Sequence, residues 1–266
     1  MRYGILTACL LAPLLGGWLT LDEPNAGPRH LRGIWDREGA SDLKRVDFYY
    51  FHQGDLGLFR FGTTDRNHTE MFRFKKTWRG LEISFKRTGE RAFSKMQLVE
   101  RPDGRRALVL ESDPRNGGRR TTYVHRAAPT SQLVPAAKDD FARMWMHRRP
   151  RLHGGLDFRI YQFQPANASG HGRGWYHEGD YDEWTTESLT YHKGQDTLHL
   201  RFDEPREIAA SPYQLNRSRK AAVLGLDADP RWFGRPSRFE DTGPTLMDNE
   251  PDLRSWRSFT SALEAQ

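Results

Sequence analysis

The feature of this sequence that most constrains its fold is an internal repeat. The segment LVLESDPR at 108–115 returns as LGLDADPR at 224–231, and a Gly-Arg pair follows each copy. Further matches keep the same order along the chain, with few changes of spacing: Trp35 with Trp145, Asp47 with Asp157, Gly57 with Gly174, Asp65 with Asp182, and Phe85 with Phe202. Such a series predicts a tandem duplication, in which the two copies share one fold.

Within each copy, short runs of alternating apolar and polar residues predict β-strands. Turn-forming residues such as Pro102-Asp103-Gly104 separate them, and no helical pattern intervenes. Hairpins that follow one another form an antiparallel meander, and closing a meander into a barrel removes its exposed edges. We therefore expect an all-β protein of two tandem antiparallel meander β-barrels, each of about eight short strands. In the first copy the expected strands are 31–36, 46–51, 57–61, 70–74, 81–85, 93–99, 107–110 and 121–125.

Changes of composition place the boundaries of the two units. The first barrel is expected over 30–127 and the second over 141–243, with 128–140, rich in Ala and Pro, as the linker. The tail at 244–266 carries apolar residues at helical spacing, so a short C-terminal helix is expected there. The residues of its apolar face would be Leu253, Trp256, Phe259 and Leu263.

The segment 1–23 differs from the rest of the chain and predicts export. Ile5 to Leu19 is apolar apart from Thr7, which is too short for the roughly 20 residues of a membrane span and typical of an export signal or anchor. Cys9, the single cysteine, lies in a Leu-Thr-Ala-Cys sequence that resembles a lipoprotein lipobox. We expect a periplasmic, envelope-anchored or secreted protein whose body forms no disulfide.

The charge of the chain favours anionic partners. Its formal net charge is +6, its pI is near 9.5, and an excess of this sign attracts nucleic acid, phospholipid headgroups or acidic polymers. Because 35 acidic residues are interspersed among 41 basic ones, much of this charge forms a mixed surface. Export argues against nucleic acid, and contact with a membrane is expected only through the N-terminal segment.

One family resemblance follows from the first expected strand. Gly33-Ile34-Trp35 resembles the Gly-x-Trp signature of lipocalins and bacterial lipocalin-like (calycin-type) domains. The resemblance implies a barrel in which the tryptophan closes one end and an arginine from a late strand packs across it. By that analogy Arg119 or Arg126 would cover Trp35. A ligand, when present in such folds, sits in the barrel mouth, but the fold itself implies no catalytic residues.

Glu70 and Glu187 are the inward-facing polar residues of matching strands. Each shares a face with apolar residues, so both carboxylates should point into a barrel near its rim. A buried carboxylate is costly unless it is paired, and Arg115 and Arg231 are the best candidate partners. The four residues either close the barrel ends or anchor the polar headgroup of a ligand.

The densest polar cluster is the hairpin at 171–184, which gathers histidines, carboxylates and aromatics around glycines. Its carboxylates and His177 are cation-binding residue types, but no established metal-ligand spacing is present, so we expect no metal. His192 and His199 flank the turn at 193–196, as a zinc pair or as surface residues. The residues of this hairpin expected to shape ligand selectivity are Trp175, Tyr176, His177, Tyr181 and Trp184.

Nucleotide-binding and hydrolase motifs are missing from the sequence, so no cofactor is expected. We expect a non-enzymatic binding protein that holds a small, partly apolar ligand in one or both barrel mouths. The alternative is an interaction module with solid barrels that docks a protein or an anionic envelope polymer through basic aromatic loops. An enzyme that uses the histidine-rich hairpin is a third hypothesis.

Overall fold

A computed structural model describes residues 31–39, 44–52, 54–126, 134–135, 141–152, 155–218, 222–244 and 246–247. These residues form strands and turns, and the helical segments among them are the three-residue 3-10 turns η1 (Pro114–Asn116) and η2 (Pro230–Trp232). The predicted all-β class is confirmed. Within the expected linker, β10 (Val134–Pro135) pairs with β19 (Leu246–Met247). The expected export segment 1–23 and the helix expected over 253–263 lie outside the described residues.

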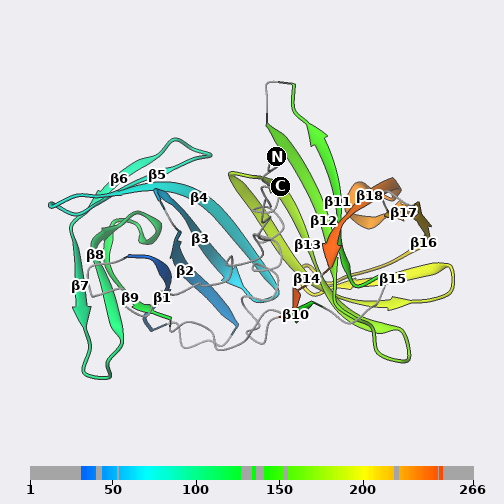
Figure 1. Cartoon of the computed structure of the whole chain (residues 1–266), viewed down its shortest axis with the longest axis horizontal. Helices are drawn as coiled ribbons and strands as arrows, with labels where there is room; N and C mark the ends of the chain where they lie inside the picture. Colours follow the sequence, from blue (N-terminus) through cyan, green and yellow to red (C-terminus); the bar gives the residue numbers. More distant parts are fainter. Residues whose placement is uncertain are drawn as a thin grey trace, which may run out of the picture.

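Strands β11 to β18 form a closed antiparallel barrel (Figure 1). Each strand pairs with the next along the chain, and β18 returns to pair with β11, where Asp241 lies opposite Trp145. Closure leaves this meander without a free edge. The strands are β11 (Arg143–Pro150), β12 (Leu156–Phe163), β13 (His171–Asp180), β14 (Glu183–Lys193), β15 (Thr197–Phe202), β16 (Glu207–Arg217), β17 (Ala222–Asp229) and β18 (Arg235–Pro244).

Strands β1 to β9 form an antiparallel meander of the same kind. Strand β1 pairs with both β2 and β9, and β5 pairs with β6 as β7 does with β8. Each strand range expected in the first copy overlaps one of these strands or, at 93–99, two of them. They are β1 (Gly33–Arg37), β2 (Arg45–Phe51), β3 (Leu56–Thr63), β4 (Arg66–Lys76), β5 (Leu81–Phe85), β6 (Arg91–Ser94), β7 (Met96–Glu100), β8 (Arg106–Asp113) and β9 (Arg119–His125).

The two groups of strands join through β4 and β14, which run side by side at the centre of the molecule (Figure 1). Residues 66–70 of β4 pair antiparallel with 183–187 of β14, and His68 lies opposite Thr185 at the middle of the register. Strands β3, β4, β14 and β13 therefore make one continuous sheet. The halves meet through 66–70 and 183–187, two segments that the predicted duplication aligns with each other.

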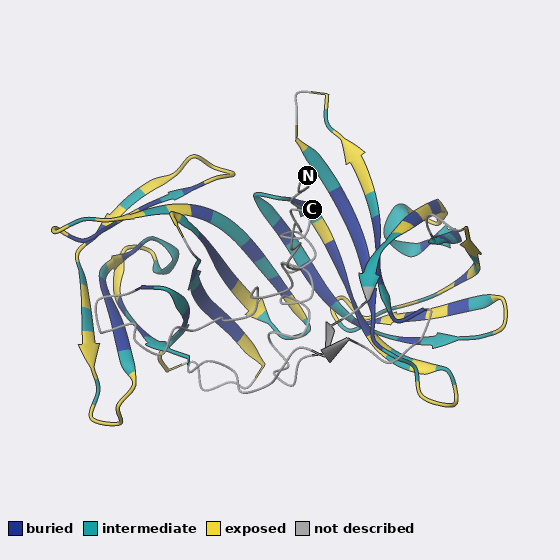
Figure 2. Ribbon diagram, in the orientation of Figure 1, coloured by how far each residue is buried: buried dark blue, intermediate teal, exposed yellow. Residues whose placement is uncertain are grey.

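An apolar cluster packs between the two groups of strands. Its residues come from the outward faces of β1 to β3, β11, β12 and β14, and the buried parts of these strands appear in dark blue in Figure 2. Trp184 is 2% exposed, and its ring lies 6.5 Å from that of Phe158. Burial of this face fixes how the halves sit against each other. The buried members are Ile34, Val46, Phe48, Leu58, Met144, Met146, Phe158, Ile160 and Trp184.

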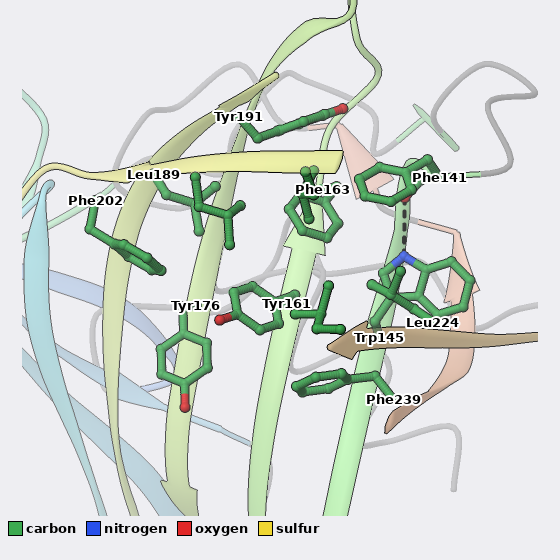
Figure 3. Close-up of a cluster of buried hydrophobic side chains, with 13 residues drawn as sticks. Phe141, Trp145, Tyr161, Phe163, Tyr176, Leu189, Tyr191, Phe202, Leu224 and Phe239 are labelled. Carbon is green, nitrogen blue, oxygen red and sulfur yellow. Dashed lines mark hydrogen bonds between the residues drawn. The ribbon is translucent and has the colours of Figure 1, made fainter. Parts of the chain in front are cut away.

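Large aromatic side chains fill the interior of the β11 to β18 barrel (Figure 3). The Trp145 indole is fully buried and donates to the Phe141 carbonyl at 3.1 Å. The Phe141 ring stacks on Phe163, with 4.6 Å between ring centroids. Each such side chain contributes roughly 1.5–3 kcal/mol when fully buried. The other buried members are Tyr161, Tyr176, Leu189, Tyr191, Leu198, Leu200, Phe202, Leu224, Leu226 and Phe239.

The β1 to β9 strands enclose a similar cluster around Trp35. Its indole donates to the Leu31 carbonyl at 2.6 Å, as Trp145 does to Phe141. The arginine over the Trp35 ring is Arg106, with 5.6 Å from its guanidinium carbon to the ring centroid, so the expected Arg119 or Arg126 is wrong. Arg126 instead pairs with Asp36 outside the cluster, and Arg119 lies at the far end of β9 from Trp35.

Candidate functional site

A buried aspartate ends β8 in the first half and β17 in the second. The Asp113 carboxylate is fully buried and accepts hydrogen bonds from the hydroxyls of Tyr49 (2.9 Å) and Tyr123 (2.5 Å) and from the Arg115 amide (3.0 Å). Burial, with the adjacent Asp113 charge, raises the pKa of Tyr49 well above its usual value, so this hydroxyl stays a donor. These bonds fix the start of η1.

Asp229 repeats this arrangement before η2. It is fully buried, accepts from the Tyr161 hydroxyl at 2.8 Å and the Arg231 amide at 3.0 Å, and pairs with Arg159 at 3.2 Å. In both halves the aspartate thus accepts from a local amide directly ahead of a proline and ends its strand. We therefore assign a structural role to this carboxylate.

The expected partner of Glu70 is confirmed. Arg115 lies 2.6 Å from Glu70, measured from Nε to Oε2, and 2.9 Å from Glu90. Its guanidinium carbon sits 3.4 Å from the centroid of the Phe85 ring. Because two carboxylates and an aromatic face already surround this cation, it closes the end of the strand cluster.

Glu187 has the matching partner in the other half. Arg231 lies 2.6 Å from Glu187 and 2.7 Å from Glu207, and its guanidinium carbon is 3.7 Å from the Phe202 ring centroid. Burial raises the pKa of Glu187, and the Arg231 charge opposes that shift. The four residues expected at the barrel rims therefore form one ion pair in each half, beside interiors that aromatic side chains already fill.

The aromatic residues expected to select a ligand are dispersed by the fold. Tyr181 and Trp184 pack in the cluster between the halves, and Tyr176 lies inside the β11 to β18 barrel. Trp175 faces the outside of β13 and lines a small cavity of about 80 Å³ beside Thr64. The structure does not bring these side chains together around one ligand site.

His177 lies within the joint between the halves. It is 1% exposed, and its ring nitrogens lie 2.9 Å from the Thr186 hydroxyl and 3.0 Å from the Gln162 amide oxygen. Burial, with a smaller contribution from the nearby Arg60 charge, lowers its pKa to about 3. A neutral, doubly hydrogen-bonded histidine in this place holds β12, β13 and β14 in register.

The carboxylates of the 171–184 hairpin are engaged by basic side chains. Asp180 pairs with Arg87 and Arg151, each at 2.7 Å. Asp182 lies 2.6 Å from Lys86, and Glu183 lies 2.8 Å from a ring nitrogen of His68. Across the described part of the chain, His, Cys, Asp and Glu side chains form no group of three or more that could hold a metal ion. These contacts tie the hairpin to β4, to the turn that follows β5 and to the turn that follows β11.

A groove of about 530 Å³ runs over the outer face of β13, β14, β15 and β16. Side chains alternate between the faces of a strand, so the residues beside the inward Tyr191 and Leu200 point into this groove. None of the described residues that line it is acidic. The lining residues are His171, Gly172, Arg173, Thr190, Tyr191, His192, His199, Leu200, Arg201 and Ile208.

Three histidines form a row across the floor of this groove. His171 lies directly opposite His192, and His192 lies opposite His199, on three neighbouring strands. The ring centroids are 4.4 Å apart in the first pair and 5.8 Å apart in the second. The row presents a continuous run of imidazole rings at the surface.

A second row crosses the same strands two residues further along. Arg173 lies opposite Thr190, which in turn lies opposite Arg201, and the next neighbour is Ile208 on β16. Both arginines are exposed, and Ile208 is 75% exposed. The groove therefore offers two guanidiniums and a hydroxyl beside the imidazole row, and these groups donate hydrogen bonds to anionic oxygens.

Sequence reasoning identified His192 and His199 as a possible pair but missed the groove. Its polar residues are scattered over 171–201, and strand register alone brings them together. The available signal was alternation: Thr190, His192, His199 and Arg201 each sit one position from an inward apolar residue, whereas glycines flank His171 and Arg173.

Comparisons of the chain with protein-family models, with curated proteins and with solved structures found no match. Among the residues that the structure describes, no helix has the length and hydropathy to cross a membrane.

Proposed function

We propose that this chain is a non-enzymatic binding protein that takes an anionic ligand in the groove over β13 to β16. The observation that carries the proposal is the lining of the groove, where Arg173, Arg201 and three histidines face solvent without a carboxylate among the lining residues. Guanidinium groups bind carboxylate, sulfate and phosphate oxygens in a paired geometry, and imidazoles add further donors. The excess positive charge of the whole chain would draw such a ligand toward the surface.

The proposal includes two tandem eight-stranded barrels. Strand β1 pairs with β9 as β11 pairs with β18, and this supports a second closed ring in the first half. Strands β6 and β7 then count as one strand interrupted at Lys95, whose carbonyl accepts from the Glu111 amide at 3.0 Å. The buried Trp35 of the Gly-x-Trp segment supports the lipocalin-like assignment of this fold.

We place the ligand outside the barrels rather than in their mouths. The interior of each half holds a cluster of buried aromatic residues, and Arg115 and Arg231 are each shared between two carboxylates. A headgroup that entered there would have to separate ion pairs that are largely screened from water, which is costly. The exposed groove needs no such rearrangement.

We also propose that the protein acts outside the cytoplasm. The apolar segment from Ile5 to Leu19 and the lack of any cysteine after Cys9 support export. In that setting, the acidic polymers of a cell envelope and small secreted anions are the available ligands.

The test is isothermal titration of the full chain with sucrose octasulfate, a small polyanion, at low ionic strength. The Arg173→Gln/Arg201→Gln variant removes both groove guanidiniums, and Arg73→Gln/Arg91→Gln is its matched control. Arg91 occupies the repeat position of Ile208, and Arg73 that of Thr190. Both variants lower the net charge by two.

We expect the groove variant to lose at least about tenfold in affinity, or about 1.4 kcal/mol, and the control to stay within about twofold. An equal loss of affinity in both variants would mean that binding of the polyanion depends only on the net charge of the chain. That result, or no binding to the unmodified chain, would overturn the proposed function.

A further inference from the structure

The spacing of the two groove arginines restricts the ligand. Arg173 and Arg201 lie on β13 and β15, with Thr190 of β14 between them in register. Neighbouring strands are about 4.8 Å apart, so the two arginines emerge about 10 Å apart. The Thr190 hydroxyl is the one side-chain hydrogen-bonding group between them in this row. The fixed cations of the groove are thus two isolated charges and not a continuous strip.

A densely charged chain does not match this spacing. Along the axis of a duplex, one nucleic-acid strand carries a phosphate about every 3.4 Å, which would place about four negative charges over a span that offers two fixed cations. Two of those charges could meet the guanidiniums, and those between them would face only Thr190. A ligand with separated acidic groups leaves no anion unmatched.

The imidazole row indicates what carries the acidic groups. His171, His192 and His199 run parallel to the arginine row, two residues or about 7 Å away along the strands. Ring faces and the exposed Ile208 provide flat, weakly polar contact surface, and ring nitrogens provide hydrogen bonds. Sugar rings, which combine an apolar face with a rim of hydroxyls, fit such a surface.

We propose that the groove binds an acidic glycan with separated carboxylates, lying across β13 to β15 so that two carboxylates meet Arg173 and Arg201. The sugar rings that carry these carboxylates pack over the neighbouring histidine row. This inference rests on the proposed function and specifies its ligand class. Chains in which a uronate alternates with a neutral sugar are the simplest members of that class.

The experiment measures the affinity of the full chain for four probes under one low-salt buffer: a hyaluronan tetrasaccharide, in which glucuronate alternates with a neutral sugar, the neutral maltotetraose, tetrapolyphosphate and sucrose octasulfate. The variants are Arg173→Gln/Arg201→Gln, which removes the anion contacts, and His192→Ala/His199→Ala, which removes most of the ring platform. Arg73→Gln/Arg91→Gln again serves as the charge-matched control. Far-UV circular dichroism verifies that each variant keeps its strands.

We expect the hyaluronan tetrasaccharide to bind at least tenfold more tightly than maltotetraose and tetrapolyphosphate. The arginine variant should weaken binding of the hyaluronan tetrasaccharide at least tenfold, and the histidine variant at least threefold. Binding of tetrapolyphosphate in the groove as tight as that of the hyaluronan tetrasaccharide, or an unchanged affinity in the histidine variant, would overturn the glycan inference and leave the anion site standing. Failure of sucrose octasulfate to bind would remove the proposed function itself.

Discussion

The two halves of the molecule have similar interiors but different outer faces. In the second half, the positions on β14 and β15 hold His192 opposite His199. The matching positions in the first half hold Lys75 opposite Glu82, so a cation there faces an anion across the strands. Arg73, at the position of Thr190, is paired with Asp55 at 2.6 Å. In the first half, basic side chains at these surface positions thus lie opposite or pair with acidic ones. In the second half, the described lining of the groove contains no acidic residue.

The interiors, in contrast, repeat the same contacts. Arg115 bridges Glu70 and Glu90 over a phenylalanine, and Arg231 bridges Glu187 and Glu207 over another. A contact needed to close either half is present in both, whereas the groove occurs on the face where the halves differ. The comparison separates the residues that hold the fold from those that we assign to binding.

The largest effect is expected from breaking the repeated ion pairs. Arg231→Met should leave Glu187 largely buried with only the longer contact to Arg66, at 3.6 Å, and destabilise the protein by about 3 kcal/mol. Arg115→Met should cost a similar amount through Glu70. Urea denaturation, followed by tryptophan fluorescence, measures both. If one variant has the same free energy of unfolding as the unmodified chain, the two ion pairs do not contribute equally to stability.

A similar loss is expected at the joint between the halves. Trp184→Ala removes a buried indole from the shared apolar cluster and should cost about 3 kcal/mol. Trp78 is 90% exposed, so Trp78→Ala should change the free energy of unfolding by less than about 0.5 kcal/mol. Thermal unfolding of the two variants compares them directly. A small effect of Trp184→Ala would imply that each half is stable without the other.

The buried histidine of the joint predicts a pH dependence. The pKa of His177 is about 3 in the folded protein, below the ordinary value of 6.5. Between these values the unfolded chain binds a proton that the folded chain does not, so stability falls as the pH is lowered from 6.5 toward 3. The contribution is at most about 1.4 kcal/mol per pH unit.

The measurement is the urea midpoint of the full chain at a series of pH values. His177→Gln should reduce the loss of stability below pH 6.5. The control is His199→Gln, which replaces an exposed histidine of the groove and should leave the pH dependence of stability unchanged. An unaltered slope in His177→Gln would assign the acid sensitivity to other groups.

The smallest effect concerns one turn that differs between the halves. Phe233 adopts a left-handed backbone with φ of 56° and is 89% exposed, whereas the matching Gly117 has φ of 61°. Phe233→Gly should therefore stabilise the protein by about 0.5–1 kcal/mol, because glycine adopts this conformation without strain. Gly117→Ala should destabilise it by a similar amount. Calorimetry of both variants tests the pair, and a loss of stability in Phe233→Gly would mean that the exposed ring makes contacts of its own.

Alternation and turn residues were sufficient to place the strands of the first half, because each strand shows its own apolar face. The same reasoning paired Glu70 with Arg115 and Glu187 with Arg231, since an inward carboxylate requires a cation. The antiparallel pairing of β4 with β14 could not be predicted, because a strand that gains a second partner carries no distinct pattern. For that reason Trp184, which packs in the joint, looked like a ligand-binding aromatic.

The groove could not be predicted from the sequence for a related reason. His171, His192 and His199 become neighbours only through the register of three strands. A shift of one residue in one strand would turn its histidine into the barrel interior. The local sequence pattern predicts on which face of the sheet a residue lies. Its neighbours on the adjacent strands are decided by strand register, which depends on the whole barrel.

The most direct test of the account is proton–carbon NMR of the histidine Cε1 groups during titration with sucrose octasulfate, with signals assigned from single His→Gln variants. The account predicts that the signals of His171, His192 and His199 shift together and saturate at one concentration. The signals of His52, His68 and His125 in the first half should stay in place. Shifts centred on the first half, or spread evenly over both halves, would contradict the assignment of binding to the β13 to β16 groove.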